Sequence, residues 1–176
     1  MRYYAGIGSR TITDQEKNII KTIAKRLADN GFVVYSGNAE GSDISFQEGS
    51  ELKCVLLLPW KGFNKKCYDV TKSLAQFPVG DSPEGQASIK DYHPLPGSLS
   101  HGGRLMMARN WHQIMGFDIY PQVEFVICCA NRVDGKILGG TGQACRIAEA
   151  FGLPVFNIRD ENWMENFNAF MKETKV

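Results

Sequence analysis

Residues 139–158, with the sequence GGTGQACRIAEAFGLPVFNI, constrain the fold of this chain more than any other stretch. Gly139, Gly140 and Gly142 come first, and they allow a tight turn and a close approach of the backbone to a bound group. A helical pattern follows, ended by a glycine and a proline, and then an apolar strand. The N-terminus of such a helix exposes free N–H groups and positive dipole charge, which favours a bound anion such as phosphate. A tight turn without a ligand is the alternative.

Short apolar runs alternate with helical patterns along most of the chain. Besides the run at residues 155–158, four runs have strand character: residues 3–7, 32–35, 53–58 and 123–129. The main helical patterns lie at residues 13–27, 105–115, 143–151 and 163–171. Such alternation is typical of a parallel sheet with helices on both faces. The chain is therefore predicted to be an α/β protein, a Rossmann-like three-layer sandwich with about five mainly parallel strands.

Residues 61–100 do not fit this alternation. They contain four prolines and scattered aromatic residues, and so long a segment without clear periodicity is unusual in a compact domain. We therefore expect an irregular excursion that faces a ligand or partner, with at most a short helix at residues 68–75. Neither a repeat nor a linker divides the chain, so residues 1–176 are expected to form one domain.

Charge and cysteine content limit the classes of function. The net charge is +1 and the pI about 7.6, which argues against binding nucleic acid or anionic membrane through bulk charge. The five cysteines are odd in number and lack the spacing of metal ligands. We therefore expect a reducing, cytoplasmic location and neither a metal nor a cofactor. The N-terminal residues show no signal-peptide pattern, and no apolar run approaches the ~20 residues of a membrane helix.

Three strand-to-helix turns are rich in glycine or polar residues: residues 5–10 (AGIGSR), 36–43 (SGNAEGSD) and 139–142 (GGTG). In open α/β sheets, ligands bind beyond the carboxyl ends of the strands, so these turns are expected to meet at one site. Arg10, with Ser9, suits a phosphate or carboxylate clamp, because its guanidinium group can donate two parallel hydrogen bonds. A cation near a helix start is also unfavourable unless an anion lies close by.

Several other candidates have two interpretations. Asn38 and Ser42 suit hydrogen bonds to a ribose or phosphate, whereas Ser42 or Asp43 can equally cap the helix that follows. Trp60 and Phe63 can stack on a base or cover a small satellite core. Tyr68 belongs with these two aromatic residues and has the same two interpretations.

Taken in order, these turns resemble those of the SLOG superfamily of Rossmann-like nucleotide-binding proteins, in particular its YspA-like and DprA-like (Smf) branches. The resemblance rests on Ala5-Gly6-Ile7-Gly8-Ser9-Arg10, Ser36-Gly37-Asn38-Ala39-Glu40-Gly41-Ser42-Asp43, Ala108-Arg109-Asn110 and Gly139-Gly140-Thr141-Gly142. It extends over almost the whole chain and covers the segment after Pro59 least.

The resemblance implies a ligand with a ribose and a phosphate: a nucleotide, a cyclic nucleotide or ADP-ribose. A protein of this kind would act as a sensor or sequester its ligand, and a homodimer is expected. The candidate ligand-binding residues are Gly8, Ser9, Arg10, Ser36, Gly37, Asn38, Ser42, Asp43, Arg109, Asn110, Asn131, Gly139, Gly140, Thr141, Gly142 and Gln143. Trp60 and Phe63 are the candidates for base stacking.

Hydrolysis of a nucleotide N-glycosidic bond is one alternative. Related phosphoribohydrolases of the superfamily use an arginine, which Arg109 matches, and a glutamate just after the glycine turn. Arg146 stands where that glutamate is expected, and an arginine neither activates water nor stabilises an oxocarbenium-like centre. Asp43 and Glu40 are the remaining weak candidates for a catalytic carboxylate.

A DprA-like single-stranded DNA-binding protein is the other alternative. It predicts a basic stripe beside stacking aromatic residues and a strong salt dependence of binding. The balanced net charge does not favour it.

Overall fold

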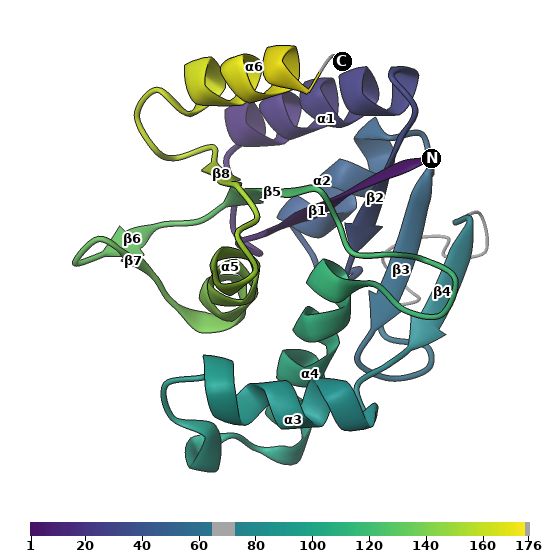
Figure 1. Ribbon diagram of the computed structural model, residues 1–176, viewed down its shortest axis with the longest axis vertical. Coiled ribbons are helices and arrows are strands. Elements are labelled where there is room, and N and C mark those ends of the chain that lie inside the picture. Colours follow the sequence, from purple (N-terminus) through teal and green to yellow (C-terminus); the bar gives the residue numbers. More distant parts are fainter. Residues whose placement is uncertain (65–72, 175–176) are drawn as a thin grey trace.

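The computed structural model describes residues 1–64 and 73–174, and its centre is a six-stranded parallel sheet in the order β4-β3-β2-β1-β5-β8 (Figure 1). The strands are β1 (Arg2–Gly8), β2 (Phe32–Ser36), β3 (Cys54–Leu58), β4 (Ala75–Pro78), β5 (Phe125–Cys129) and β8 (Val155–Asn157). This confirms the predicted Rossmann-like α/β fold, with one strand more than the expected five.

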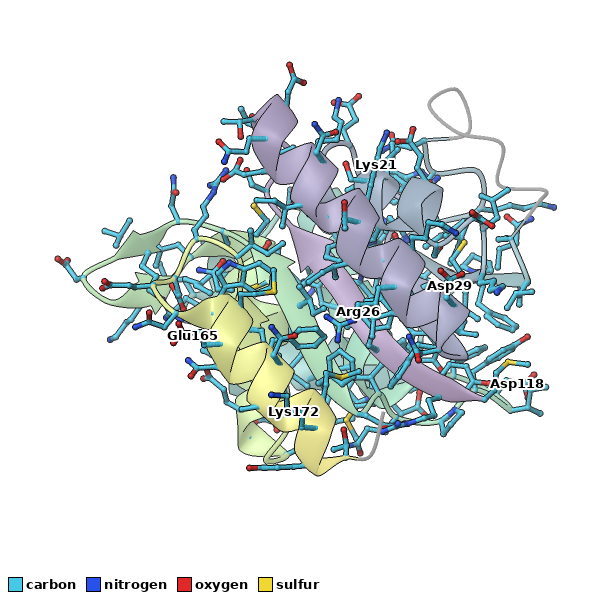
Figure 2. All side chains as sticks on the ribbon, turned by 90° about the horizontal axis from the view of Figure 1, so that it is seen from above. Lys21, Arg26, Asp29, Asp118, Glu165 and Lys172 are labelled. Carbon is cyan, nitrogen blue, oxygen red and sulfur yellow. The ribbon has the colours of Figure 1, made fainter. Side chains whose placement is uncertain are left out.

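Helices cover both faces of the sheet. They are α1 (Asp14–Asp29), α2 (Ser42–Gly49), α3 (Pro83–Tyr92), α4 (His101–Met115), α5 (Gly139–Ala150) and α6 (Trp163–Glu173). Helices α1, α2 and α6 bury apolar side chains against one face, whereas α4 and α5 do so against the other. Figure 2 shows α1 and α6 side by side, and Arg26 of α1 donates a hydrogen bond to Asn168 of α6 (3.2 Å).

Strands β1 and β5 are buried on both faces, so their side chains alternate between two cores. Tyr4 and Phe125 point into the core beneath α1 and α6. Ala5 and Val126 point into the core beneath α4 and α5. This alternation explains why the sequence of β5 is apolar throughout, as expected for a central parallel strand.

The order of the strands reverses beside β1. The chain moves outward from β1 through β2 and β3 to β4, and then returns to place β5 on the other side of β1. The carboxyl ends of the two strands lie level, with Gly8 of β1 opposite Cys129 of β5. The connections leave these ends toward opposite faces, which opens a crevice where ligands bind in folds of this type.

The segment expected to be irregular contains regular structure. Residues 75–78 form edge strand β4, residues 83–92 form α3, and Pro96–Ser98 form a short 3-10 helix. The prolines misled the prediction because those within the regular elements occupy positions that tolerate proline. Pro78 ends an edge strand, and Pro83 is the first residue of α3, behind the N-cap Ser82. Most of the expected short helix, including Tyr68, lies outside the described residues, and Ala75 belongs to β4.

The glycine stretch also differs from the expected turn. Gly139, Gly140 and Gly142 lie in the first turn of α5, and Leu138 is its N-cap residue. The loop before it carries a small antiparallel hairpin of β6 (Arg132–Val133) and β7 (Lys136–Ile137), which projects from the body of the protein in Figure 1.

The described residues show neither a disulfide, nor a membrane-spanning helix, nor a cluster of metal-binding side chains. Cys54, Cys128 and Cys129 are buried in the two cores, and none of the described cysteines forms a disulfide. None of the helices in the described ranges is long and apolar enough to cross a bilayer. Within the same ranges, no group of three or more His, Cys, Asp or Glu residues lies close enough together to hold a metal ion.

Candidate functional site

A pocket of about 400 Å³ lies at the reversal point, beyond the carboxyl end of β1. Its walls come from the turn after β1, the turn between β2 and α2, one side of α4, and the first two turns of α5. The lining residues are Ile7, Gly8, Ser9, Arg10, Ala39, Asp43, Met106, Met107, Arg109, Asn110, Gln113, Gly140, Thr141 and Ala144. A volume of this size is typical of small-molecule sites. All three turns that the sequence singled out therefore reach one pocket.

About half of the candidate residues line the pocket directly. These are Gly8, Ser9, Arg10, Asp43, Arg109, Asn110, Gly140 and Thr141. The other candidates lie beneath the surface, beside the pocket or elsewhere. They are Ser36, Gly37, Asn38, Ser42, Asn131, Gly139, Gly142, Gln143, Trp60 and Phe63.

Arg109 is buried at the floor of the pocket, with 5% of its surface exposed. Its Nη1 atom donates hydrogen bonds to the carbonyl oxygens of Gly37 (2.6 Å) and Leu57 (3.3 Å). Burial lowers the pKa of the guanidinium group, and the nearby Asp43 carboxylate opposes this effect. Its Nε atom is buried and has no hydrogen-bond partner among the described residues. Arg109 thus joins the ends of β2 and β3 and still has an unused donor.

Asp43 is the only carboxyl group among the described residues that line the pocket. Its Oδ2 atom accepts hydrogen bonds from the N–H groups of Gly37 (3.0 Å) and Ala39 (3.3 Å), so it organises the turn before α2. Burial raises its pKa to about 6, although the Arg109 charge and the two backbone bonds act in the opposite direction. A carboxyl group with such a pKa can exchange a proton near neutral pH.

Arg10 lies exposed at the rim of the pocket. Its Nη2 atom contacts the sulfur of Met106 (3.8 Å), and within the described part of the chain no carboxylate pairs with it. Ser9 beside it uses its hydroxyl group for the local turn, donating to the carbonyl oxygen of Thr11 (2.9 Å). Arg10 is therefore a cation available for an anionic group of a ligand.

The N-terminus of α5 forms another wall of the pocket. It has neither a side-chain cap nor an acidic residue in its first turn, so its free N–H groups and positive dipole are not offset locally. Asn110 of α4 donates to the carbonyl oxygen of Gly140 (3.1 Å) and to Oε1 of Gln143 (2.9 Å). Asn110 and the fully buried Gln143 hold α5 against α4 and fix the position of this wall.

The polar residues of the second turn mainly organise the backbone. Ser36 accepts a hydrogen bond from Gln47 (2.7 Å), and Ser42 donates to the carbonyl oxygen of Ser9 (2.9 Å), which joins two of the turns. Asn38 adopts a left-handed conformation (φ 58°) and donates to the carbonyl oxygen of Phe63 (3.0 Å). All three side chains are buried, which favours the structural interpretation of Ser36, Asn38 and Ser42.

The aromatic candidates lie next to the pocket. Phe63 lines a smaller hollow of about 110 Å³ with Arg10, Glu40 and Asn64. Trp60 packs edge-to-face on Phe63, with ring centroids 5.0 Å apart, and 40% of its surface is exposed. The two hollows share Arg10. This places Trp60 and Phe63 near the same cation as the main pocket.

Two residues lie away from the pocket. Asn131 is exposed and accepts a hydrogen bond from Arg159 (2.9 Å). Arg146 lies on the other side of α5, where its Nε atom donates to the carbonyl oxygen of Tyr92 (2.8 Å) and its side chain lines a separate hollow beside the hairpin. The residues of α5 that line the main pocket are Gly140, Thr141 and Ala144. None of them carries a carboxylate.

Sequence reasoning missed Gln113 and the apolar lining of the pocket. Met106 and Met107 form part of the α4 wall, and Gln113 lies one helical turn after Arg109. The spacing of four residues was a usable signal, because residues i and i+4 share one face of a helix. Ala39 and Ala144 carried no chemical signal and could be placed only by the fold.

Comparison with known proteins agrees with this architecture. A family model described as DNA recombination-mediator protein A matches residues 1–54, which include the first two turns of the site. No curated protein sequence gives a significant match. DNA processing protein A from Helicobacter pylori, whose structure was described for its single-stranded DNA binding mode, is 21% identical with a TM-score of 0.58, covering 99% of this chain and 73% of that one.

Two further solved structures share the fold. DNA processing protein A (DprA) from Streptococcus pneumoniae is 16% identical with a TM-score of 0.54, covering 91% of this chain and 50% of that one. A structural-genomics target, TM1055, is 15% identical with a TM-score of 0.55, covering 88% of this chain and 72% of that one. The match over residues 1–54 supports the resemblance of this part of the chain to the DprA-like family, and the solved structures show the same fold over most of the chain.

Proposed function

We propose that this protein binds a nucleotide-derived ligand in the pocket at the carboxyl end of β1, as a sensor or a sequestering protein. The observation that carries the proposal is the combination of Arg10, a rim cation without a carboxylate partner among the described residues, with the uncapped N-terminus of α5 on one pocket. Together they favour an anion of phosphate type. The two methionines supply an apolar wall, and the volume suits a single nucleotide.

Isothermal titration calorimetry against nucleoside monophosphates, cyclic nucleotides, ADP-ribose and NAD tests this proposal. The recovered ligand is then analysed by chromatography. We expect saturable binding of at least one of these compounds, with the ligand recovered intact. Absence of binding to every member of the panel, with folded protein confirmed by circular dichroism, contradicts the proposal.

Single-stranded DNA is a second candidate ligand, and the comparisons favour it. The family match and the structure from Helicobacter pylori both come from DNA-processing proteins. The pocket is large enough for one nucleotide of a strand, and the exposed Trp60 beside it offers a stacking surface. Gel-shift titration of an oligonucleotide at increasing salt distinguishes the candidates, because a strand that contacts many cations shows a much steeper salt dependence than a mononucleotide.

Hydrolysis of the ligand is a third candidate, and Asp43 is the specific observation in its favour. It is a buried carboxyl group with a raised pKa that lines the pocket, whereas position 146 lies on the other side of α5. Release of free base in proportion to protein concentration, abolished in Asp43→Asn, is the expected result for an enzyme. Full recovery of intact nucleotide argues for binding alone.

A further inference from the structure

Gln113 of α4 makes no side-chain hydrogen bond to any described residue, whereas Gln143 lacks a partner only at its Nε2 atom. Only 2% of the surface of Gln113 is exposed, and this residue lines the pocket. Its Nε2 atom is buried without a partner, and no hydrogen bond joins its side chain to any other described residue. Asn110 on the same helix, by contrast, donates to Gly140 and Gln143. A buried amide without partners is costly for folding alone, on the order of 1–3 kcal/mol, which points to a partner supplied by a ligand.

The position of Gln113 along α4 gives the pocket two chemically different ends. Arg10 contacts Met106, near the middle of the helix. Gln113 lies seven residues further along, which corresponds to about 10 Å at 1.5 Å per residue. Arg109 lies between them, with its own unpartnered Nε donor. Within the part of the chain that the structure describes, the rim therefore carries a cation without a carboxylate partner, and the other end carries a neutral amide with an unused donor.

A primary amide can match a base edge on which a donor stands next to an acceptor. It offers an N–H₂ donor and a carbonyl acceptor side by side, and glutamine pairs with the N6 and N7 edge of adenine in this way. A phosphate has acceptors but no donor when it is fully ionised. Gln113 suits the base better than the phosphate, whereas Arg10 and the N-terminus of α5 suit the phosphate.

We infer that Gln113 is the residue that selects the base, and that the ligand lies along α4 with its phosphate at Arg10 and an adenine-type base at Gln113. This inference rests on the proposed function, since it assigns an orientation and a specificity to the same site. It goes further by naming a base edge with adjacent donor and acceptor groups as the feature that the pocket recognises.

The test compares adenosine monophosphate with ribose 5-phosphate, which has the same phosphate and no base, by calorimetry on the full chain. For Gln113→Leu we expect roughly 5- to 150-fold weaker binding of adenosine monophosphate, as for the two lost neutral hydrogen bonds of the amide–base pair, and unchanged binding of ribose 5-phosphate. The melting temperature should stay the same or rise, because an unpartnered buried amide is removed. A purely structural role for Gln113 predicts a lower melting temperature instead.

Two further variants complete the design. Gln113→Met keeps the length and flexibility of the side chain and should give the same selective loss, so the test does not depend on the folding of the leucine variant. Gln86→Leu is the matched control: Gln86 lies on α3, donates to the carbonyl oxygen of Gly80 (2.7 Å), and does not line the pocket. It should not change binding of either compound.

The outcomes separate the two levels of the proposal. Equal weakening of both compounds, or undiminished binding of adenosine monophosphate by both Gln113 variants, overturns the orientation and leaves the proposed function standing. Failure of the wild-type protein to bind either compound or any other nucleotide overturns the proposed function, and the orientation falls with it.

Discussion

The Nη1 atom of Arg109 lies 2.6 Å from the carbonyl oxygen of Gly37, and a Cβ atom on Gly37 would lie only 1.6 Å from that nitrogen. The same Cβ would lie 2.9 Å from Oδ2 of Asp43. The glycine is therefore required because the guanidinium group passes directly over the backbone. This relationship connects residues 72 positions apart and positions the buried charge at the floor of the pocket.

The substitution Gly37→Ala tests this relationship. The methyl group has to displace Arg109, which breaks its two carbonyl contacts and moves a buried charge, so we expect a loss of roughly 2–4 kcal/mol in the free energy of unfolding. Urea denaturation gives the value. Gly97→Ala is the control, because no atom lies within 4 Å of its Cβ position. Equal stability of the two variants would mean that Arg109 is free to move.

Two glycines of α5 are predicted to have separate roles. A Cβ on Gly142 would lie 1.9 Å from the carbonyl oxygen of Ile137, whereas one on Gly140 meets only ordinary contacts at 3.4 Å or more. Gly142→Ala should lower the melting temperature by several degrees, because the start of α5 must shift. Gly140→Ala should keep the melting temperature and weaken ligand binding, because its methyl group enters the pocket. Thermal unfolding and calorimetry on both variants check this contrast.

Arg10→Gln should separate binding from stability. Arg10 is exposed, and among the described residues its side chain makes no ion pair and one polar contact, to the sulfur of Met106, so the free energy of unfolding should change by less than about 0.5 kcal/mol. Loss of a charged hydrogen bond to phosphate should weaken nucleotide binding roughly 10- to 100-fold and reduce its salt dependence. Arg26→Gln, on α1 and shown in Figure 2, is the control for removal of an exposed arginine. Equal affinities of Arg10→Gln and wild type for the nucleotide would show that the phosphate does not bind at Arg10.

Asp43 gives a prediction for pH. Burial raises its pKa in the folded protein to about 6, above the ordinary value of 3.8. The folded state therefore binds the proton more tightly, so this stabilisation is complete below about pH 4 and is lost as the pH rises through 6. Two pKa units correspond to about 3 kcal/mol. Urea unfolding of wild type and Asp43→Asn between pH 4 and pH 7 should show wild type losing stability relative to the variant as the pH rises. A difference independent of pH would contradict the assignment.

The sheet and most of its helices could be predicted because they follow from local patterns. Thr13 and Glu16 form a capping box at the start of α1, in which the Thr13 side chain accepts a hydrogen bond from the Glu16 N–H (3.1 Å). The apolar run that contains β5 is buried on both faces. Strand β4 and helix α3 were not predicted, because the local pattern around them is misleading. Pro78 and Pro83 look like breaks in regular structure unless their positions at the end of a strand and the start of a helix are known.

The sequence also determined which turns form the pocket, because the carboxyl ends of parallel strands meet at one edge of the sheet and their turns carry the polar residues. Only the tertiary structure decided the direction of each side chain. The side chains of Asn38 and Ser42 donate hydrogen bonds to backbone carbonyl groups. Arg146 lies on the far side of α5, whereas Gln113 lines the pocket. The physical reason is that local spacing fixes which residues share a helix face, whereas the packing of that helix against distant segments decides which face lines the pocket.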